Sequence, residues 1–193
     1  QDLVGFGRRN MKVAPAEVTD IVMYQIGALE AFCRTNGIAM QHVKPHGAMY
    51  NMAEKDDKLA EAICRGIKAV NQDLILLGLG SGKMVKAAKA LGLKTAGEVF
   101  ADRAYMEDGT LVPRSQEGAM ITDEEEAVAR VLEMVQKGTV TAITGKKIAV
   151  QADSICVHGD GQKALLFVQK IRSELEKAGV VIAPMKEVIV GES

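Results

Sequence analysis

Neither sign of charge is in excess in this chain. Its 193 residues carry 24 Lys and Arg against 25 Asp and Glu, which gives a formal net charge of −1. Without a broadly basic face, nucleic acid and anionic membranes are not expected as partners. The sequence also has no apolar run of the ~20 residues that span a bilayer, and no basic-then-apolar leader. Hydrophobic residues make up 48%, so we expect an ordinary globular protein with a single domain over residues 1–193.

Cysteine is scarce and placed without pattern. Cys33, Cys64 and Cys156 lie far apart and in no metal-like spacing, which predicts three buried, small apolar side chains in a reducing cytoplasm. No serine lies in a GxSxG motif, and Cys156 is expected inside a strand. Covalent catalysis is therefore not indicated. General acid–base chemistry, or water activation by a metal held by His and Asp, suits the remaining residue types.

One stretch resembles a phosphate-binding loop without matching it. Residues 78–84 read GLGSGKM, with Met84 where such a loop needs Ser or Thr, and with no glycine five places before Gly82. The stretch is therefore rejected as an ATP site. Ser81 and Gly82 at a helix N-terminus could still hold an anion.

Helical and strand-like patterns alternate along the chain. A helix is expected from Pro15 until Gly37 stops it, and further helices over 56–70, 81–91, 123–135 and 162–177. Strands are expected over 39–43, 74–79, 95–100 and 154–157, a hairpin over 139–149, and a last strand or edge over 180–183. A long polar loop covers 101–122. This alternation predicts βα units and a mostly parallel sheet of about five strands, and a closed barrel would need two or three more.

Two motifs place polar, titratable residues beside glycines where strands end. They are HVKPHGAMYN at 42–51 and CVHGDG at 156–161, and together they hold all three histidines. Because the carboxyl ends of parallel strands share one rim, we expect His46 and His158 to face one cavity there. The candidate catalytic residues are Lys44, His46, Glu98, Asp102, His158 and Asp160. The alternative for each histidine is a hydrogen-bonded loop residue.

Arginines supply candidate anion ligands. Arg103 and Arg114 lie on either side of a loop with Gly and Pro, where a guanidinium can fork onto a carboxylate or phosphate. Arg8, in the pair Arg8-Arg9, has the same potential. All three are candidates for substrate binding. The alternative is a solvated loop, or a pairing with Glu107 or Asp108.

Six ordered blocks carry a resemblance to a known family. They read GFGRRNM, VMYQIGAL, QHVKPHGAMYN, EVFADRAY, DGTLVPRS and CVHGDG, and together they cover essentially the whole chain. In this order they resemble the LamB/YcsF family of lactam-utilization proteins.

The resemblance implies a fold and an activity. The fold would be a deformed (β/α) barrel of about seven strands, like that of polysaccharide deacetylases. The activity would be that of the A-subunit of a prokaryotic ATP-dependent 5-oxoprolinase, which opens 5-oxo-L-proline to L-glutamate. ATP with Mg²⁺ would then be required, with subunits B and C as partners. Two alternatives stay open: a metal-dependent, deacetylase-like amide or carbohydrate hydrolase, and a non-catalytic scaffold subunit.

The beginning of the sequence departs from the family pattern. Members begin with a DLNCDLGE-like block, followed by GFHAGD-like and AHP-like blocks, and none of these is present in the sequence. The chain opens at Gln1 on a Gly-rich loop, so we expect a fragment of a longer polypeptide. If the family holds a divalent metal by an Asp and histidines, as deacetylases do, those ligands would lie mainly in the missing part. The metal ligands are therefore left unknown.

Overall fold

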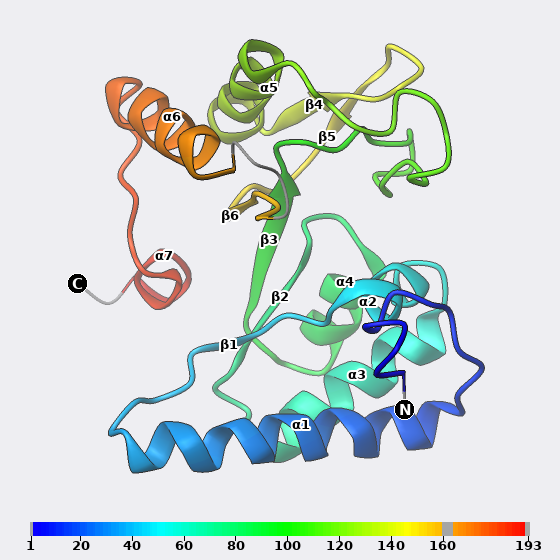
Figure 1. Cartoon of the computed structure of the whole chain (residues 1–193). Helices are drawn as coiled ribbons and strands as arrows, with labels where there is room; N and C mark the ends of the chain where they lie inside the picture. Colours follow the sequence, from blue (N-terminus) through cyan, green and yellow to red (C-terminus); the bar gives the residue numbers. More distant parts are fainter. Residues whose placement is uncertain (1, 160–163, 192–193) are drawn as a thin grey trace. The chain divides into compact units, whose positions relative to one another are not determined.

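The computed structural model describes residues 2–159 and 164–191. By its internal contacts the chain divides into two compact units, a first unit up to residue 96 and a second unit from residue 97. The expected single domain stays a prediction. Each unit is described in turn, with the element labels of Figure 1.

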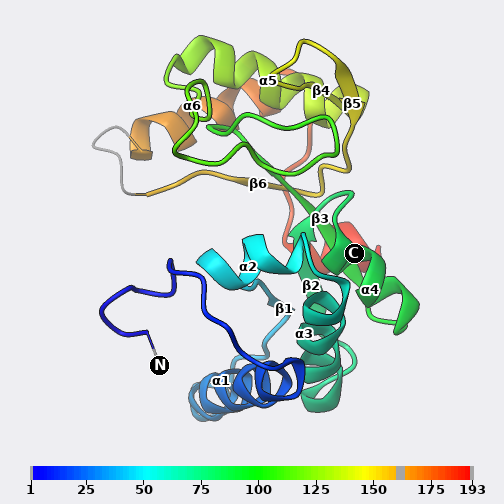
Figure 2. The ribbon, with the colours of Figure 1, turned by 90° about the vertical axis from the view of Figure 1, so that its right-hand side faces the viewer.

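Two long helices pack side by side in the first unit. The helix α1 (Pro15–Thr35) lies against α3 (Asp57–Val70) (Figure 1; Figure 2). Val18, Val22 and Ile26 are buried at this contact because a spacing of four residues keeps them on one face of α1. The Asp56 side chain caps α3 by accepting hydrogen bonds from two backbone N–H groups. Both helices are confirmed where the sequence predicts them.

The first unit also holds a parallel strand pair and two shorter helices. The strand β1 (His42–Val43) pairs with β2 (Ile75–Leu79), which is buried along its whole length. Only the last two residues of the expected strand over 39–43 pair with β2. The strand does not continue beyond them because Pro45, which follows soon after, has no N–H to donate. The helix α4 (Lys83–Ala90) is close to its predicted range, whereas α2 (Gly47–Ala53) is not among the elements that the sequence predicts. Seven residues are too few for a helical period to show.

A second parallel pair organises the second unit. There β3 (Thr95–Phe100) pairs with β6 (Ser154–Cys156), with Phe100 opposite Cys156. The helix α5 (Glu124–Lys137) begins after its cap Asp123 and ends at Gly138, whose φ of 62° suits glycine. It packs against the hairpin of β4 (Thr139–Thr141) and β5 (Lys147–Ala149), as Figure 2 shows, and against α6 (Ala164–Lys177). The predicted strands over 95–100 and 154–157, the hairpin over 139–149 and the helices over 123–135 and 162–177 are confirmed, with ends that differ by a few residues.

One prediction for the second unit is wrong. Residues 180–183 form no strand, and the helix α7 (Met185–Val190) follows instead, after Pro184. The apolar run there is exposed, with Val181 at 85%, so the predicted last strand or edge is a solvent-facing connection. The stretch 101–122 is the long loop that the sequence predicts, without helix or strand, but part of it is apolar and buried. It folds back on itself, burying Ala104, Val112 and Ala119 in a small core of its own.

The fold is mixed α/β with parallel strand pairing, as the alternation of patterns predicts. The part of the chain that the structure describes contains six strands, two of which form the antiparallel hairpin. The seven-stranded, deacetylase-like barrel stays a prediction. Among the described residues, no helix is both long enough and apolar enough to cross a membrane.

Candidate active site

A histidine and an aspartate meet beyond the ends of β3 and β6. Because Phe100 and Cys156 are opposite each other in these parallel strands, the residues that follow emerge at the same edge. The Nδ1 atom of His158 lies 2.7 Å from Oδ2 of Asp102, and both side chains are half-buried. The ring of Phe100 stacks on that of His158, with centroids 6.0 Å apart. Two of the predicted catalytic residues are thus brought together.

The contact with Asp102 orients the imidazole. An ionised carboxylate only accepts hydrogen bonds, so Nδ1 of His158 is the donor and Nε2 is left to exchange a proton with another group. The second oxygen of Asp102, Oδ1, is buried and has no hydrogen-bond partner among the described residues. This arrangement, a histidine held in one tautomer by a shielded carboxylate, is suited to general acid–base catalysis.

Arg103 and Arg114 bring positive charge to the same place. The Arg103 side chain is buried, with 6% exposed, and its Nη2 donates to the carbonyl oxygen of Val112 at 2.6 Å. Burial, and secondly the neighbouring charge of Arg114, lower the pKa of Arg103, whereas Asp102 acts in the opposite direction. Two guanidinium groups that repel each other form a site that favours an anion.

Arg130 supports this cluster from α5 and was not singled out in the sequence. Its Nη2 donates to the carbonyl oxygen of Arg103 and its Nη1 to that of Thr141, each at 3.3 Å. Nothing in the sequence distinguishes it from other helical arginines, because its importance comes from the backbone carbonyls that the fold places around it. Glu98, also a predicted catalytic residue, lies within β3 and is only 2% exposed.

A second group of predicted residues lies in the first unit. His46 precedes α2, and the edge of the Phe6 ring faces its imidazole, with centroids 6.4 Å apart. The backbone N–H of Ala48 donates to the carbonyl oxygen of Gly7 at 2.8 Å. This bond docks the segment that carries Arg8 beside His46, so the GFGRRN and KPHGAMYN motifs form one structure. Lys44 is exposed on the same segment as His46.

Two expectations for the site stay predictions. His46 belongs to the first unit and His158 to the second, so a single cavity that both face remains to be tested. Asp160 lies outside the described residues. A divalent metal also stays a prediction, because no cluster of three or more His, Cys, Asp or Glu side chains forms within the described ranges.

The anion position at the start of α4 is filled by the protein itself. The backbone N–H of Lys83 donates to Oε2 of Glu54 at 2.6 Å, and a Cβ at Gly82 would overlap that carboxylate. The expectation that Ser81 and Gly82 hold an external anion is therefore wrong. The sequence does not reveal Glu54 as the ligand because it comes from the end of another helix, α2.

Burial raises the pKa of the Glu54 carboxyl above its ordinary value of 4.5, against the opposing backbone hydrogen bonds. The folded chain thus holds this proton to a higher pH than the unfolded chain, and the stability that Glu54 contributes is lost as pH rises through the raised pKa. We expect Glu54→Gln to gain thermal stability relative to the unsubstituted protein as pH increases from 4 to 8. A difference in melting temperature between the two proteins that stays the same from pH 4 to pH 8 would contradict this prediction.

The three cysteines differ in burial. Cys64 is fully buried, and burial raises its pKa to about 12, so it is the inert apolar side chain that the sequence predicts. Cys33 and Cys156 are only partly buried, which corrects the prediction for them. Cys33 lies near the end of α1 and Cys156 at the end of β6, where less of the core covers them.

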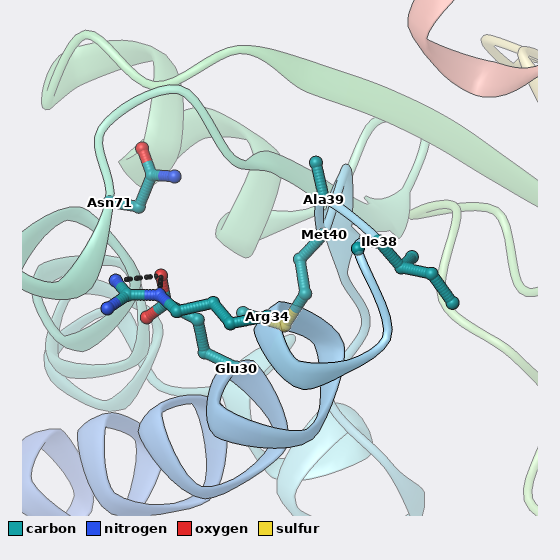
Figure 3. A pocket seen from close by; sticks show the side chains of 7 residues that line it. Glu30, Arg34, Ile38, Ala39, Met40 and Asn71 are labelled. Atoms are coloured by element: carbon teal, nitrogen blue, oxygen red, sulfur yellow. Dashed lines mark hydrogen bonds and ion pairs between the residues drawn. The ribbon is translucent and has the colours of Figure 1, made fainter.

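A cavity of about 370 Å³ is lined by other residues. It is found where α1 ends, between Glu30, Arg34, Met40 and Asn71 (Figure 3). Its charged groups pair with each other, since Nη2 of Arg34 donates to Oε1 of Glu30 at 2.6 Å. None of the predicted site residues lines this cavity. The candidate site is therefore identified by its titratable and charged side chains and not by the size of a cavity.

The sequence matches the model of the LamB/YcsF family over residues 1–190. The chain belongs to this family. It is 62% identical to the 5-oxoprolinase A-subunit of Clostridium beijerinckii over 187 residues, which are 97% of this chain and 73% of that protein. It is 51% identical to the protein of the same name from Bacillus subtilis, over 96% of this chain and 72% of the relative.

A solved structure agrees with this assignment. The lactam utilization protein from Thermus thermophilus superposes with a TM-score of 0.86 at 45% identity, over 94% of this chain and 72% of that one. The resemblance drawn from the six sequence blocks is thus confirmed. The relatives are named as one subunit of 5-oxoprolinase, so each of them is a component of a larger enzyme.

Proposed function

We propose that this chain is the A-subunit of a 5-oxoprolinase, and that it opens the ring of 5-oxo-L-proline to give L-glutamate in a reaction coupled to ATP hydrolysis. The observation that carries the proposal is the Asp102–His158 pair beside Arg103 and Arg114. A general acid–base pair next to paired cations fits a reaction that hydrolyses an amide bond in a substrate with a free carboxylate.

Four side chains of the second unit each have a separate role in the proposed reaction. Arg103 and Arg114 bind the carboxylate of 5-oxoproline. The Nε2 atom of His158 takes a proton from the attacking water, while Asp102 keeps the ring oriented and stabilises the imidazolium. The water oxygen bonds to the amide carbon, the C–N bond breaks, and the proton passes from His158 to the leaving nitrogen. A general acid or base of this kind contributes a factor of about 10²–10⁴.

Coupling to ATP is chemically sensible because a five-membered lactam is an unstrained amide and hydrolyses slowly. Transfer of the terminal phosphoryl group of ATP to the amide oxygen would release ADP and make the carbon open to attack. Attack by one water with cleavage of the C–N bond would then leave an acyl phosphate, which a second water would hydrolyse to glutamate and inorganic phosphate. The stretch 78–84 does not fit a nucleotide phosphate, since Glu54 occupies the N-terminus of α4. We therefore assign no nucleotide contact to this chain, and propose that subunits B and C complete the enzyme.

The deciding experiment measures glutamate release from 5-oxo-L-proline by the complete enzyme, with and without ATP and Mg²⁺. We expect release only when ATP is present, together with one ADP per glutamate. Release without ATP that a chelator abolishes would favour a metal-dependent amide hydrolase. Release that survives replacement of His158 would favour a scaffold role for this chain.

We expect Arg114→Lys to raise the KM for 5-oxoproline about tenfold or more with a smaller effect on kcat. A lysine keeps the charge but cannot make two parallel hydrogen bonds to a carboxylate, and a charged hydrogen bond contributes about 1.5–3 kcal/mol. Initial rates over a range of substrate concentrations measure this. Arg65→Lys is the matched control, because Arg65 pairs with Glu61 on the surface of α3. An equal KM in the two variants would contradict the proposed role.

A further inference from the structure

Phe100 lies on the polar face of the pair that β3 forms with β6. Side chains alternate between the two faces of a sheet, and residues opposite each other in a parallel pair share a face. Val99 is opposite Ile155, and these two side chains form the apolar face. Phe100 lies on the other face, which it shares with Glu98 of the same strand. A phenylalanine needed only for the apolar core would be expected beside Val99, so the position of Phe100 indicates a different role.

The Phe100 ring covers one face of the His158 imidazole. The two rings are stacked, with their centroids 6.0 Å apart and 24° between their planes. This separation is within the range of about 4.5–7 Å that is typical of offset-stacked aromatic pairs. Phe100 is only 5% exposed, so its ring has little freedom to move away from the imidazole.

The contact with Asp102 does not by itself fix the direction of Nε2 of His158. One hydrogen bond, from Nδ1 of His158 to Oδ2 of Asp102, holds a single atom of the imidazole. The ring can still turn about that atom, and such a rotation would move Nε2 out of line with the attacking water. A flat ring packed against the face of the imidazole blocks this rotation. Asp102 therefore selects the tautomer, and Phe100 sets the plane of the ring.

The backbone of Phe100 is itself held by hydrogen bonds. Its N–H donates to the hydroxyl oxygen of Tyr105 at 2.8 Å, and Tyr105 is fully buried. The carbonyl oxygen of Tyr105 accepts from the N–H of Ile143 at 2.9 Å. The next N–H along the chain, that of Ala101, donates to the carbonyl oxygen of Cys156 at 3.2 Å. The ring therefore projects from a well-anchored strand end.

We propose that Phe100 is a positioning residue that holds the imidazole of His158 in the plane needed for proton transfer. This inference rests on the proposed function, in which Nε2 of His158 takes a proton from the attacking water. Arg103 and Arg114 bind a different group, the substrate carboxylate. Loss of the Phe100 ring should therefore slow proton transfer without weakening substrate binding.

The kinetic test replaces Phe100 with Leu, which keeps an apolar side chain but removes the flat face. We expect kcat for glutamate release by the complete enzyme to fall about tenfold to a hundredfold, with the KM for 5-oxoproline within about twofold. Phe100→Tyr keeps the ring and should keep kcat within about threefold. Val99→Ala is the matched control. It removes buried apolar atoms on the other face of the same strand, so it should lower the melting temperature without lowering kcat.

Proton NMR of the whole chain reports the stacking independently of activity. Protons that lie over the face of an aromatic ring resonate upfield, and the chain contains only three histidines. The carbon-bound ring protons of His158 can be assigned by their absence in His158→Ala. They should move downfield in Phe100→Leu at every pH from about 5 to 9, a range that spans the titration of an ordinary histidine. In Val99→Ala they should stay in place.

The proposal is overturned if the His158 signals do not move in Phe100→Leu, because the two rings are then not stacked. It is also overturned if kcat is unchanged in that variant, or if it falls equally in Val99→Ala. If the unsubstituted enzyme releases no glutamate from 5-oxoproline, the proposed function fails. The proposal for Phe100 then depends on the His158 signals alone.

Discussion

Replacing His158 with Ala should lower the turnover of the complete enzyme by a factor of about 10²–10⁴. Asp102→Asn should lower it by a comparable factor, because an asparagine can present its amide to Nδ1 and so favour the wrong tautomer of His158. Both effects follow from the 2.7 Å contact between the two side chains. The measurement is ATP-dependent glutamate formation at saturating 5-oxoproline.

The folding control for these variants is thermal melting, which should change little because both side chains lie beyond the strand ends and are half-buried. His42→Ala is the matched histidine control, since His42 lies in β1 and outside the proposed machinery. A turnover near that of the unsubstituted enzyme in both the His158 and the Asp102 variants would remove the pair from the mechanism. That outcome would favour the scaffold role for this chain.

Among the glycine-to-alanine substitutions in the first unit, Gly47→Ala should lower the stability of the fold most. Gly47 has a φ of 60°, and a Cβ there would overlap the carbonyl oxygen of Gly7. The variant therefore combines backbone strain with loss of the bond from Ala48 to Gly7. We expect a loss of about 2–4 kcal/mol. The melting temperature should fall by about 5–15 °C.

Gly92→Ala is the control for backbone strain alone. Gly92 has a φ of 77° but nothing lies within 4 Å of a Cβ added there, so its loss should be about 1–2 kcal/mol. Equal losses at Gly47 and Gly92 would show that the docking of residue 7 on α2 contributes nothing. A larger loss at Gly47 would show that the docking of the GFGRRN segment on α2 stabilises the first unit.

Regular elements with long, periodic patterns could be predicted from the sequence alone. The helix α3 has a buried stripe at helical spacing and a capping aspartate, and β2 is an uninterrupted apolar run. Local pattern determines such elements because one buried face stabilises the whole segment. The helix α2 and the fold of residues 101–122 could not be predicted in this way. One is too short to show a period, and the other depends on contacts such as Ala104 with Ala119.

The sequence by itself determined the family, the parallel α/β character, and the polar residues that follow the strands. Only the tertiary structure decided which of those residues meet. Asp102 and His158 are 56 positions apart, and their contact depends on the register that sets Phe100 opposite Cys156. Glu54 at the start of α4 and Phe6 beside His46 are also products of packing. A sequence specifies side chains and local propensities, whereas distances between remote residues are set by burial and hydrogen bonding over the whole chain.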